Sequence, residues 1–242
     1  RDRSPSRGLG DVYKRQMRTL TLLFSFMVAF PFVLSAQSAG ELLQKVSAAL
    51  SEGQDDYAVS LFRQSVKAGA DQTEMFYWTQ VEKNSAVAPR LVNELATYYK
   101  HKRNYDKAYL FYREFLQYHS DDVPALVSCA EMEMMRGKEK DAVKTYEKVL
   151  ILDANNLQAN IFLGNYFYLQ AEREKKKLED DYKKITSPTR MQYARYRNGL
   201  SDVYSNGYAK AKDYLQRVLQ LFPSTEAGNT LEKIKKLEVE IK

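Results

Sequence analysis

Two consecutive stretches of the chain share one residue pattern: LVNELATYYKHKRNYDKAYLFYREFLQYHSDD (91–122) and ALVSCAEMEMMRGKEKDAVKTYEKVLILDANN (125–156). Matched residues in the two stretches lie 34 positions apart: Ala96 with Ala130, Ala108 with Ala142, and Tyr112 with Tyr146. Within each stretch apolar residues recur every three or four positions, the spacing of amphipathic helices, and nothing alternates as a strand does. The sequence therefore predicts a repeated unit made of two helices.

This pattern resembles the tetratricopeptide repeat. That family has a small residue at the eighth position, in helix A, and another at the twentieth, in helix B; here these are Ala96 and Ala108, then Ala130 and Ala142. Two helices approach closely where their side chains are small, and a larger side chain overpacks the contact. The resemblance implies an all-α fold, a solenoid of antiparallel helix pairs with repeats over 89–122 and 123–156.

A third repeat is predicted over 157–223, but its two halves are far apart. LQANIFLGNYFYL (157–169) opens it with Gly164 in the eighth position, yet Lys176 stands where helix B should have a small residue. The missing half is GYAKAKDYLQRVLQLFPS (207–224), in which Ala211 takes the small position. The distance from Ala142 to Ala211 is one period plus 35 residues. An insertion, placed at 171–205, therefore splits this repeat.

The insertion is predicted to form a helical hairpin. Helix A should continue to about Ile185, and ITSPT should end it, with Ser187 as N-cap and Pro188 in the first turn of the returning helix. The alternative is an irregular fourth repeat, with 189–221 as its helix pair and Gly199 in the small position.

The two ends are less regular. Residues 37–88 are predicted to hold a degenerate repeat, with Ala58 and Phe62 in helix B, followed by a short apolar helix at 73–83. Residues 224–242 have an apolar stripe at helical spacing and are predicted to be a C-terminal capping helix, because a solenoid needs polar caps over its terminal faces.

Residues 17–36, MRTLTLLFSFMVAFPFVLSA, have the features of a signal peptide: one basic residue, an apolar run, then small residues. Cleavage is expected after Ala36, with Ala39 as second choice. The apolar run is short and interrupted by Pro31, which disfavours a membrane span of ~20 residues, although a retained anchor is the alternative. We therefore expect export to the periplasm or cell envelope of a Gram-negative-like bacterium, with no stable membrane span after cleavage.

Residues 1–16 are interpreted as a sequencing or assembly artefact, because SRGLGDVYKRQ resembles the translation of a transposon-end adapter; a genuine basic extension is the alternative. The whole chain has 37 Lys and Arg residues and 31 Asp and Glu residues. Residues 1–16 contain five basic and two acidic side chains, and Arg18 is one more basic residue. Residues 37–242 therefore have 31 basic and 29 acidic residues, a net charge of +2, which gives no global case for nucleic-acid binding.

No catalytic constellation is found. The chain has no glycine-rich phosphate loop and no nucleophile motif. Cys129 is the single cysteine, and His101 and His119 are not in a cluster with metal-ligand spacing, so no metal or cofactor is expected. The predicted function is a non-catalytic scaffold that binds a partner protein.

In the tetratricopeptide-repeat family, partners commonly lie along the helix A faces of the concave surface. Carried over by position, the resemblance implies a partner-binding groove formed by ten residues: Arg90, Asn93, Thr97, Lys100, Val127, Glu131, Met135, Ile161, Asn165 and Tyr168. The lysine–asparagine set with which some members bind a C-terminal carboxylate is absent, so that ligand is not predicted.

The alternative function is electrostatic binding of an anionic envelope polymer or nucleic acid through the predicted hairpin. Residues 171–197 contain nine basic and five acidic side chains, with Tyr193 and Tyr196 beside the arginines. Nucleic acid is disfavoured, because EREKKKLEDD is a run of mixed sign, typical of a solvated helix, and because the chain is expected to be exported.

Overall fold

The computed structural model describes residues 37–241, so the predictions for 1–16 and 17–36 lie outside it. The described residues are almost entirely helical and include no strand. The helices are α2 (Ala39–Ser51), α3 (Asp55–Ala68), α4 (Ala70–Gln80), α5 (Ala88–His101), α6 (Tyr105–Tyr118), α7 (Val123–Met135), α8 (Glu139–Leu152), α9 (Leu157–Lys183), α10 (Arg190–Val203), the π-helical segment η1 (Tyr204–Tyr208), α11 (Ala209–Leu221) and α12 (Thr225–Ile241).

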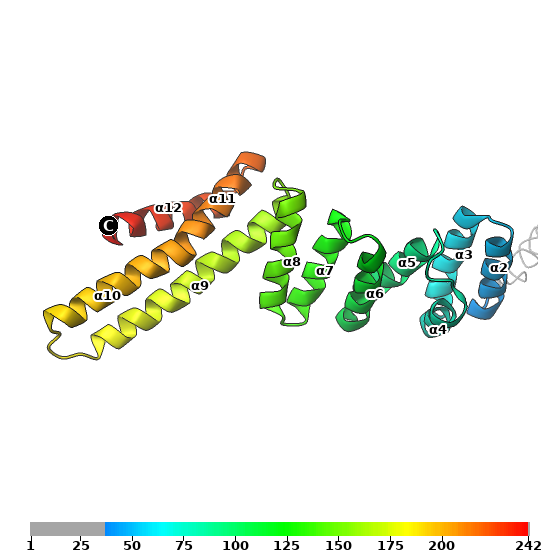
Figure 1. Cartoon of the computed structure of the whole chain (residues 1–242), viewed down its shortest axis with the longest axis horizontal. Helices are drawn as coiled ribbons and strands as arrows, with labels where there is room; N and C mark the ends of the chain where they lie inside the picture. The colour runs from blue at the N-terminus through cyan, green and yellow to red at the C-terminus, as the bar shows by residue number, and fades with distance from the viewer. Residues whose placement is uncertain (1–36, 242) are drawn as a thin grey trace, which may run out of the picture.

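The helices stack as consecutive antiparallel pairs into an elongated solenoid (Figure 1). In the two regular repeats, α5 pairs with α6 and α7 pairs with α8. The four small residues at the pair contacts are fully buried: Ala96, Ala108, Ala130 and Ala142, each with 0% of its surface exposed. Tyr112 and Tyr146 are buried beside them. The predicted all-α fold of tetratricopeptide-like helix pairs is confirmed.

The N-terminal pair is α2 with α3, and it buries Ala58 and Phe62 completely. The extra helix that follows, α4, begins at Ala70 and ends at Gln80, three residues earlier at each end than the predicted 73–83. Gly69 is the N-cap, and the Thr73 hydroxyl donates a hydrogen bond to its carbonyl at 2.9 Å. After Gln80 the backbone of Val81 is extended, which ends the helix.

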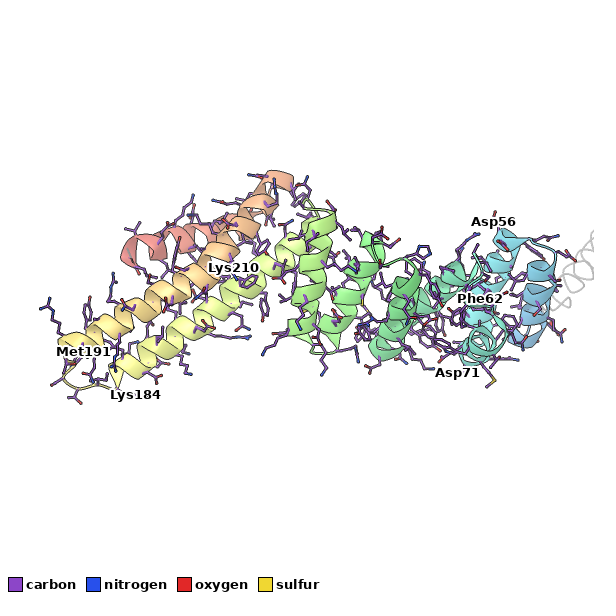
Figure 2. The ribbon with its side chains drawn as sticks, viewed as in Figure 1. Asp56, Phe62, Asp71, Lys184, Met191 and Lys210 are labelled. Carbon is purple, nitrogen blue, oxygen red and sulfur yellow. The ribbon has the colours of Figure 1, made fainter. Side chains whose placement is uncertain are left out.

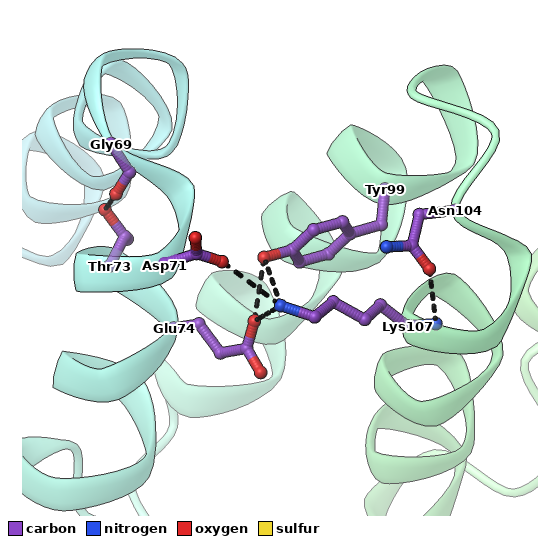
Figure 3. A network of polar contacts seen from close by, with 7 residues as sticks. All are labelled: Gly69, Asp71, Thr73, Glu74, Tyr99, Asn104 and Lys107. Carbon is purple, nitrogen blue, oxygen red and sulfur yellow. Dashed lines mark hydrogen bonds and ion pairs between the residues drawn. The ribbon is translucent and has the colours of Figure 1, made fainter.

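A polar network attaches α4 to the first regular repeat (Figure 3). Lys107 Nζ lies 2.8 Å from Glu74 Oε2 and 3.2 Å from Asp71 Oδ1. The Tyr99 hydroxyl donates to the same Glu74 oxygen at 2.7 Å. The hydrogen bond to Glu74 raises the pKa of Lys107, and burial raises the pKa of Tyr99 to about 12, so the ammonium and the phenol both stay protonated at neutral pH.

The third repeat has two unusually long helices. α9 runs without interruption for 27 residues, and α10, η1 and α11 follow one another directly as the returning arm (Figure 1). A close contact between the arms occurs where Gly207 faces Ala171: a Cβ added at Gly207 would lie 2.6 Å from the Ala171 Cβ. Gly199 meets Leu178 further out. The inserted residues thus prolong both helices of the pair and do not form an irregular fourth repeat.

The start of the returning helix differs from the prediction. Ser187 is not the N-cap and Pro188 is not in the first turn, because Thr189 caps α10 in a capping box with Gln192. In that arrangement the Thr189 hydroxyl accepts from the Gln192 N–H while the Gln192 side chain accepts from the Thr189 N–H, which satisfies two otherwise unpaired donors. Pro188 therefore precedes the helix.

The base of the hairpin is part of the core. Leu200 and Val203 are buried at the end of α10. The π-helical segment η1 then follows; a π-turn holds one residue more than an α-turn. Tyr208, the last residue of η1, and Ala211 of α11 are fully buried against α9 and α12.

The C-terminal helix α12 covers the end of the last pair. It buries Ala227, Leu231 and Ile234 against α11 and η1. Arg197 of α10 donates to the carbonyl oxygens of Glu240 and Ile241 at 3.0 and 2.6 Å, satisfying two carbonyls at its C-terminal end. None of the described helices combines the length and the apolar character needed to cross a membrane.

Candidate partner-binding groove

A groove of about 760 Å³ lies on the helix A side of the second and third repeats. Half of its lining residues are apolar or aromatic: Tyr105, Met132, Met134, Met135, Tyr146, Ile161, Phe162, Tyr166 and Leu169. Three of these are exposed large side chains, with 61% of Met135, 40% of Ile161 and 52% of Leu169 accessible to solvent. Apolar side chains gathered in a concave surface favour the docking of another apolar surface.

Five of the ten predicted groove residues line this groove, and they come from three successive helix A elements: Lys100 of α5, Glu131 and Met135 of α7, Ile161 and Asn165 of α9. The other five lie elsewhere: Arg90, Asn93, Thr97, Val127 and Tyr168. The groove is therefore confined to one part of the solenoid and does not extend along its whole concave side.

Three of the other five belong to neighbouring contacts. Arg90 pairs with Asp56 of α3 at 2.6 Å. Thr97 lines a separate cavity of about 480 Å³ near the N-terminal repeat. Val127 is partly buried against the core of the second repeat. Asn93 is exposed outside the groove.

Tyr168 faces the returning arm of the third repeat. Its ring lies 5.9 Å from the ring of Tyr208 in an edge-on arrangement, and it packs against the C-terminal core. The Tyr208 hydroxyl donates to Glu172 at 2.6 Å on the same side of α9. Tyr168 therefore packs within the third repeat and does not line the groove.

The floor of the groove is a ladder of polar side chains. Lys100 of α5 and Gln158 of α9 both donate to the Glu131 carboxylate of α7, one to each oxygen. Glu131 therefore joins three successive helix A elements, and its charge is compensated by Lys100. The ladder fixes the spacing of the helices, while the apolar side chains remain available.

One wall of the groove comes from the part of α9 where the third repeat passes into the insertion. Leu169, Gln170 and Arg173 line the groove at the position where α7, which ends at Met135, gives no further cover. Gln170 and Arg173 were missed in the sequence, although Arg173 follows Leu169 at an interval of four and so shares its helix face. Extending the helix A pattern into the insertion would have found Arg173.

Among the residues that line the groove, burial raises the pKa of Tyr146 to about 12, and the other groups with a shifted pKa lie outside the groove. Burial raises the pKa of the Cys129 thiol to about 12, so the thiol stays protonated at neutral pH and is a poor nucleophile. Nearby, burial raises the pKa of Glu133, which accepts a hydrogen bond from Thr145 at 2.7 Å. Among residues 37–241 no three His, Cys, Asp or Glu side chains come together as metal ligands would.

The charges of the hairpin are partly paired within it. Lys175 pairs with Glu179 at 3.3 Å and Lys184 with Asp181 at 2.8 Å, while Arg197 is bound to the end of α12. The two arms are joined by the stacked rings of Tyr182 and Tyr196, whose centroids are 4.4 Å apart. Lys184 and Met191 mark the outer end of the hairpin (Figure 2).

Comparison with known proteins supplies a substantial match. A crystal structure from Bacteroides ovatus, described as that of a "putative protein binding protein", is 59% identical over 85% of this chain and 100% of its own, with a TM-score of 0.76. The TPR protein YrrB is 13% identical over 83% of this chain and 94% of its own, with a TM-score of 0.35. A thermophilic TPR protein from Thermus thermophilus is 12% identical over 84% of this chain and 100% of its own, with a TM-score of 0.31.

No protein-family model and no curated protein matches the chain. The match to the Bacteroides ovatus structure covers that protein completely at high identity. Within the chain, helix pairs recur at 34 residues with small residues buried at each contact. The chain therefore belongs to the family of the Bacteroides ovatus protein, and it is a tetratricopeptide-repeat protein.

Proposed function

We propose that the chain is a non-catalytic protein-interaction scaffold whose groove between α7 and α9 binds an apolar segment of a partner protein. The observation that carries the proposal is the exposure of Met135, Ile161 and Leu169 in one concave surface. The description of the Bacteroides ovatus relative as a protein-binding protein supports the same class of function.

The groove can supply useful binding energy. Burying a large apolar side chain contributes roughly 1.5–3 kcal/mol, so three such side chains contribute about 5–9 kcal/mol before the costs of association. The ladder through Glu131 holds the three helices before a partner arrives, and a preformed site has less ordering to lose on binding. A segment with apolar side chains at helical or extended spacing fits this surface.

The test is site-specific photo-crosslinking in cells of the source organism. A photoreactive residue at Leu169 should capture a discrete partner, whereas one at Val239, which is exposed on α12, should not. Ile161→Asp should remove the Leu169 crosslink while leaving the circular dichroism spectrum unchanged, because Ile161 is on the groove surface. Equal capture from both positions, or a crosslink unaffected by Ile161→Asp, would contradict the proposal.

The electrostatic alternative predicts a different result. Binding through residues 171–197 would be insensitive to Ile161→Asp and would fall steeply with salt, because each basic contact releases counterions from the polymer. A salt titration with and without Lys176→Gln and Arg195→Gln distinguishes the two functions. Both residues are exposed, so these changes leave the fold intact.

We also propose that the chain is exported after cleavage following Ala36. The signal-like character of residues 17–36 supports export. Ser38 caps α2 by accepting from the Glu41 N–H at 3.3 Å, and Ala39 is buried. Cleavage after Ala39 would remove both the Ser38 cap and the buried Ala39, so the capped helix favours cleavage after Ala36. N-terminal sequencing of the protein from the periplasmic fraction should begin at Gln37; a product retaining Met17, or found in the cytoplasm, would contradict export.

A further inference from the structure

The turns between helices A and B share one backbone geometry but not one residue type. Gly53 and Gly137 have φ angles of +72° and +73°. The residue 34 positions before Gly137 is Arg103, and its φ is +57°. In all three turns the same two backbone hydrogen bonds close the end of helix A; in the Arg103 turn they are Arg103 N–H to Lys100 O and Asn104 N–H to Tyr99 O, both at 3.0 Å.

This left-handed position suits glycine and disfavours a residue with a Cβ. Arg103 is the only non-glycine residue between 37 and 241 with a positive φ. Its guanidinium forms no hydrogen bond or ion pair within the part of the chain that the structure describes. The fold therefore holds an arginine in an unfavourable backbone conformation without using its side chain, and such outliers cluster at functional sites.

Arg103 stands between the apolar groove and a second, polar cleft. That cleft, of about 510 Å³, lies between the α5–α6 and α7–α8 turns. Its charged lining residues are four basic and one acidic: Lys102, Arg103, Arg136 and Lys138 against Asp106. Asp106 is paired with Arg136 at 2.6 Å, so the other three cations have no carboxylate among the lining residues. Arg103, Tyr105 and Met135 line both cavities, which are therefore adjacent.

We propose that Arg103 is a specificity-determining residue that selects an acidic partner: a peptide segment whose apolar side chains enter the groove and whose Asp or Glu side chains lie over the polar cleft. Charge complementarity identifies this partner, because the cleft presents three unpaired cations next to exposed apolar side chains. A guanidinium binds a carboxylate through two parallel hydrogen bonds, which a lysine cannot reproduce with the same geometry. The inference rests on the proposed function of the groove.

The probe is a phage-displayed library of random 16-residue peptides, selected on the wild-type protein and on three variants. Arg103→Gly removes the guanidinium and suits the left-handed turn, so its melting temperature should equal or exceed that of wild type. Arg103→Lys keeps the charge. Lys45→Gln, at an exposed position of α2, is the control for net charge. The selected peptides are then synthesised and their affinities measured by fluorescence anisotropy, with Ile161→Asp to show that they occupy the groove.

Wild type and Lys45→Gln should enrich peptides in which Asp or Glu flanks apolar residues. Their affinity should fall about tenfold on Arg103→Gly, less on Arg103→Lys, and should weaken as salt is raised. Groove-binding peptides with no acidic enrichment, or with unchanged affinity for Arg103→Gly, would overturn the role of Arg103 while the groove function stands. A library that yields no peptide sensitive to Ile161→Asp would overturn both.

Discussion

The close contact between the arms of the third repeat makes Gly207→Ala a decisive substitution. The new methyl carbon would lie 2.6 Å from the Ala171 Cβ and 3.3 Å from the Ala171 Cα, whereas carbon atoms in contact normally stay about 3.5–4.0 Å apart. Both methyl carbons are attached directly to a helix backbone, so no side-chain rotation can relieve the overlap. The arms must separate at this point.

The magnitude follows from two opposing effects. Overpacking of a well-packed contact costs about 1–3 kcal/mol, while replacing glycine by alanine in a helix contributes about 0.5–1 kcal/mol in the opposite direction. We expect a net destabilisation of about 1–2 kcal/mol. Gly228→Ala in α12 is the matched control, because a Cβ there meets nothing within 4 Å; it should stabilise the protein slightly.

A compensating change tests the cause directly. Ala171→Gly combined with Gly207→Ala restores the space between the arms and leaves one glycine and one alanine at the contact, as in the wild type. The double variant should therefore recover most of the lost stability, a coupling of about 2 kcal/mol.

The assay is urea unfolding followed by far-ultraviolet circular dichroism, with thermal melting as a second measurement. A loss of 1 kcal/mol corresponds to about 2–4 °C for a chain of this size. Midpoints should be compared, since long repeat proteins can unfold in more than one step. If Gly207→Ala is as stable as Gly228→Ala, or if the double variant recovers nothing, the close-contact explanation is refuted.

Three further predictions address other parts of the fold. Ala142→Arg, at a position with no exposed surface, should cost at least about 3 kcal/mol by overpacking and by burying a charge; exposed Lys140→Arg should cost almost nothing in the same urea titration. Burial lowers the pKa of Lys83 to about 8 from an ordinary 10.5. Between these two pH values the unfolded chain binds more protons than the folded one, so the free energy of unfolding should rise with pH. Lys83→Met should flatten that rise, and an unchanged slope would contradict this assignment. The outer hairpin can be removed by replacing residues 179–198 with a short glycine–serine loop between Leu178 and Gly199, which lie in contact. Most of the removed residues are exposed, so the shortened protein should still unfold cooperatively. Loss of the cooperative transition would show that the outer hairpin belongs to the core.

Much of the fold could be read from residue spacing because the determinants are local and repeated. Ala96, Ala108, Ala130 and Ala142 stand at the helix contacts and are all buried, as the 34-residue period predicted. The hairpin could be anticipated because Ala211 resumes the interrupted pattern after 35 extra residues. The exact start of α10 could not be predicted, because the choice between neighbouring N-cap residues depends on whether a reciprocal partner such as Gln192 is in place.

The groove was only half predictable. Family positions place residues on the correct face of each helix A, and Glu131, Met135 and Ile161 do line the groove. Tyr168, by contrast, lies outside this groove and packs against Tyr208 of the returning arm.

The sequence by itself determined the class of the protein: which residues form helices, how the helices pair, and where the period is interrupted. The tertiary structure alone decided where a partner has room to bind. It made α9 a wall of the groove and put Arg103, in a left-handed turn, between an apolar groove and a basic cleft. The physical reason is that helix periodicity depends on the spacing of neighbouring residues, whereas the exposure of a helix face depends on which distant segment covers it.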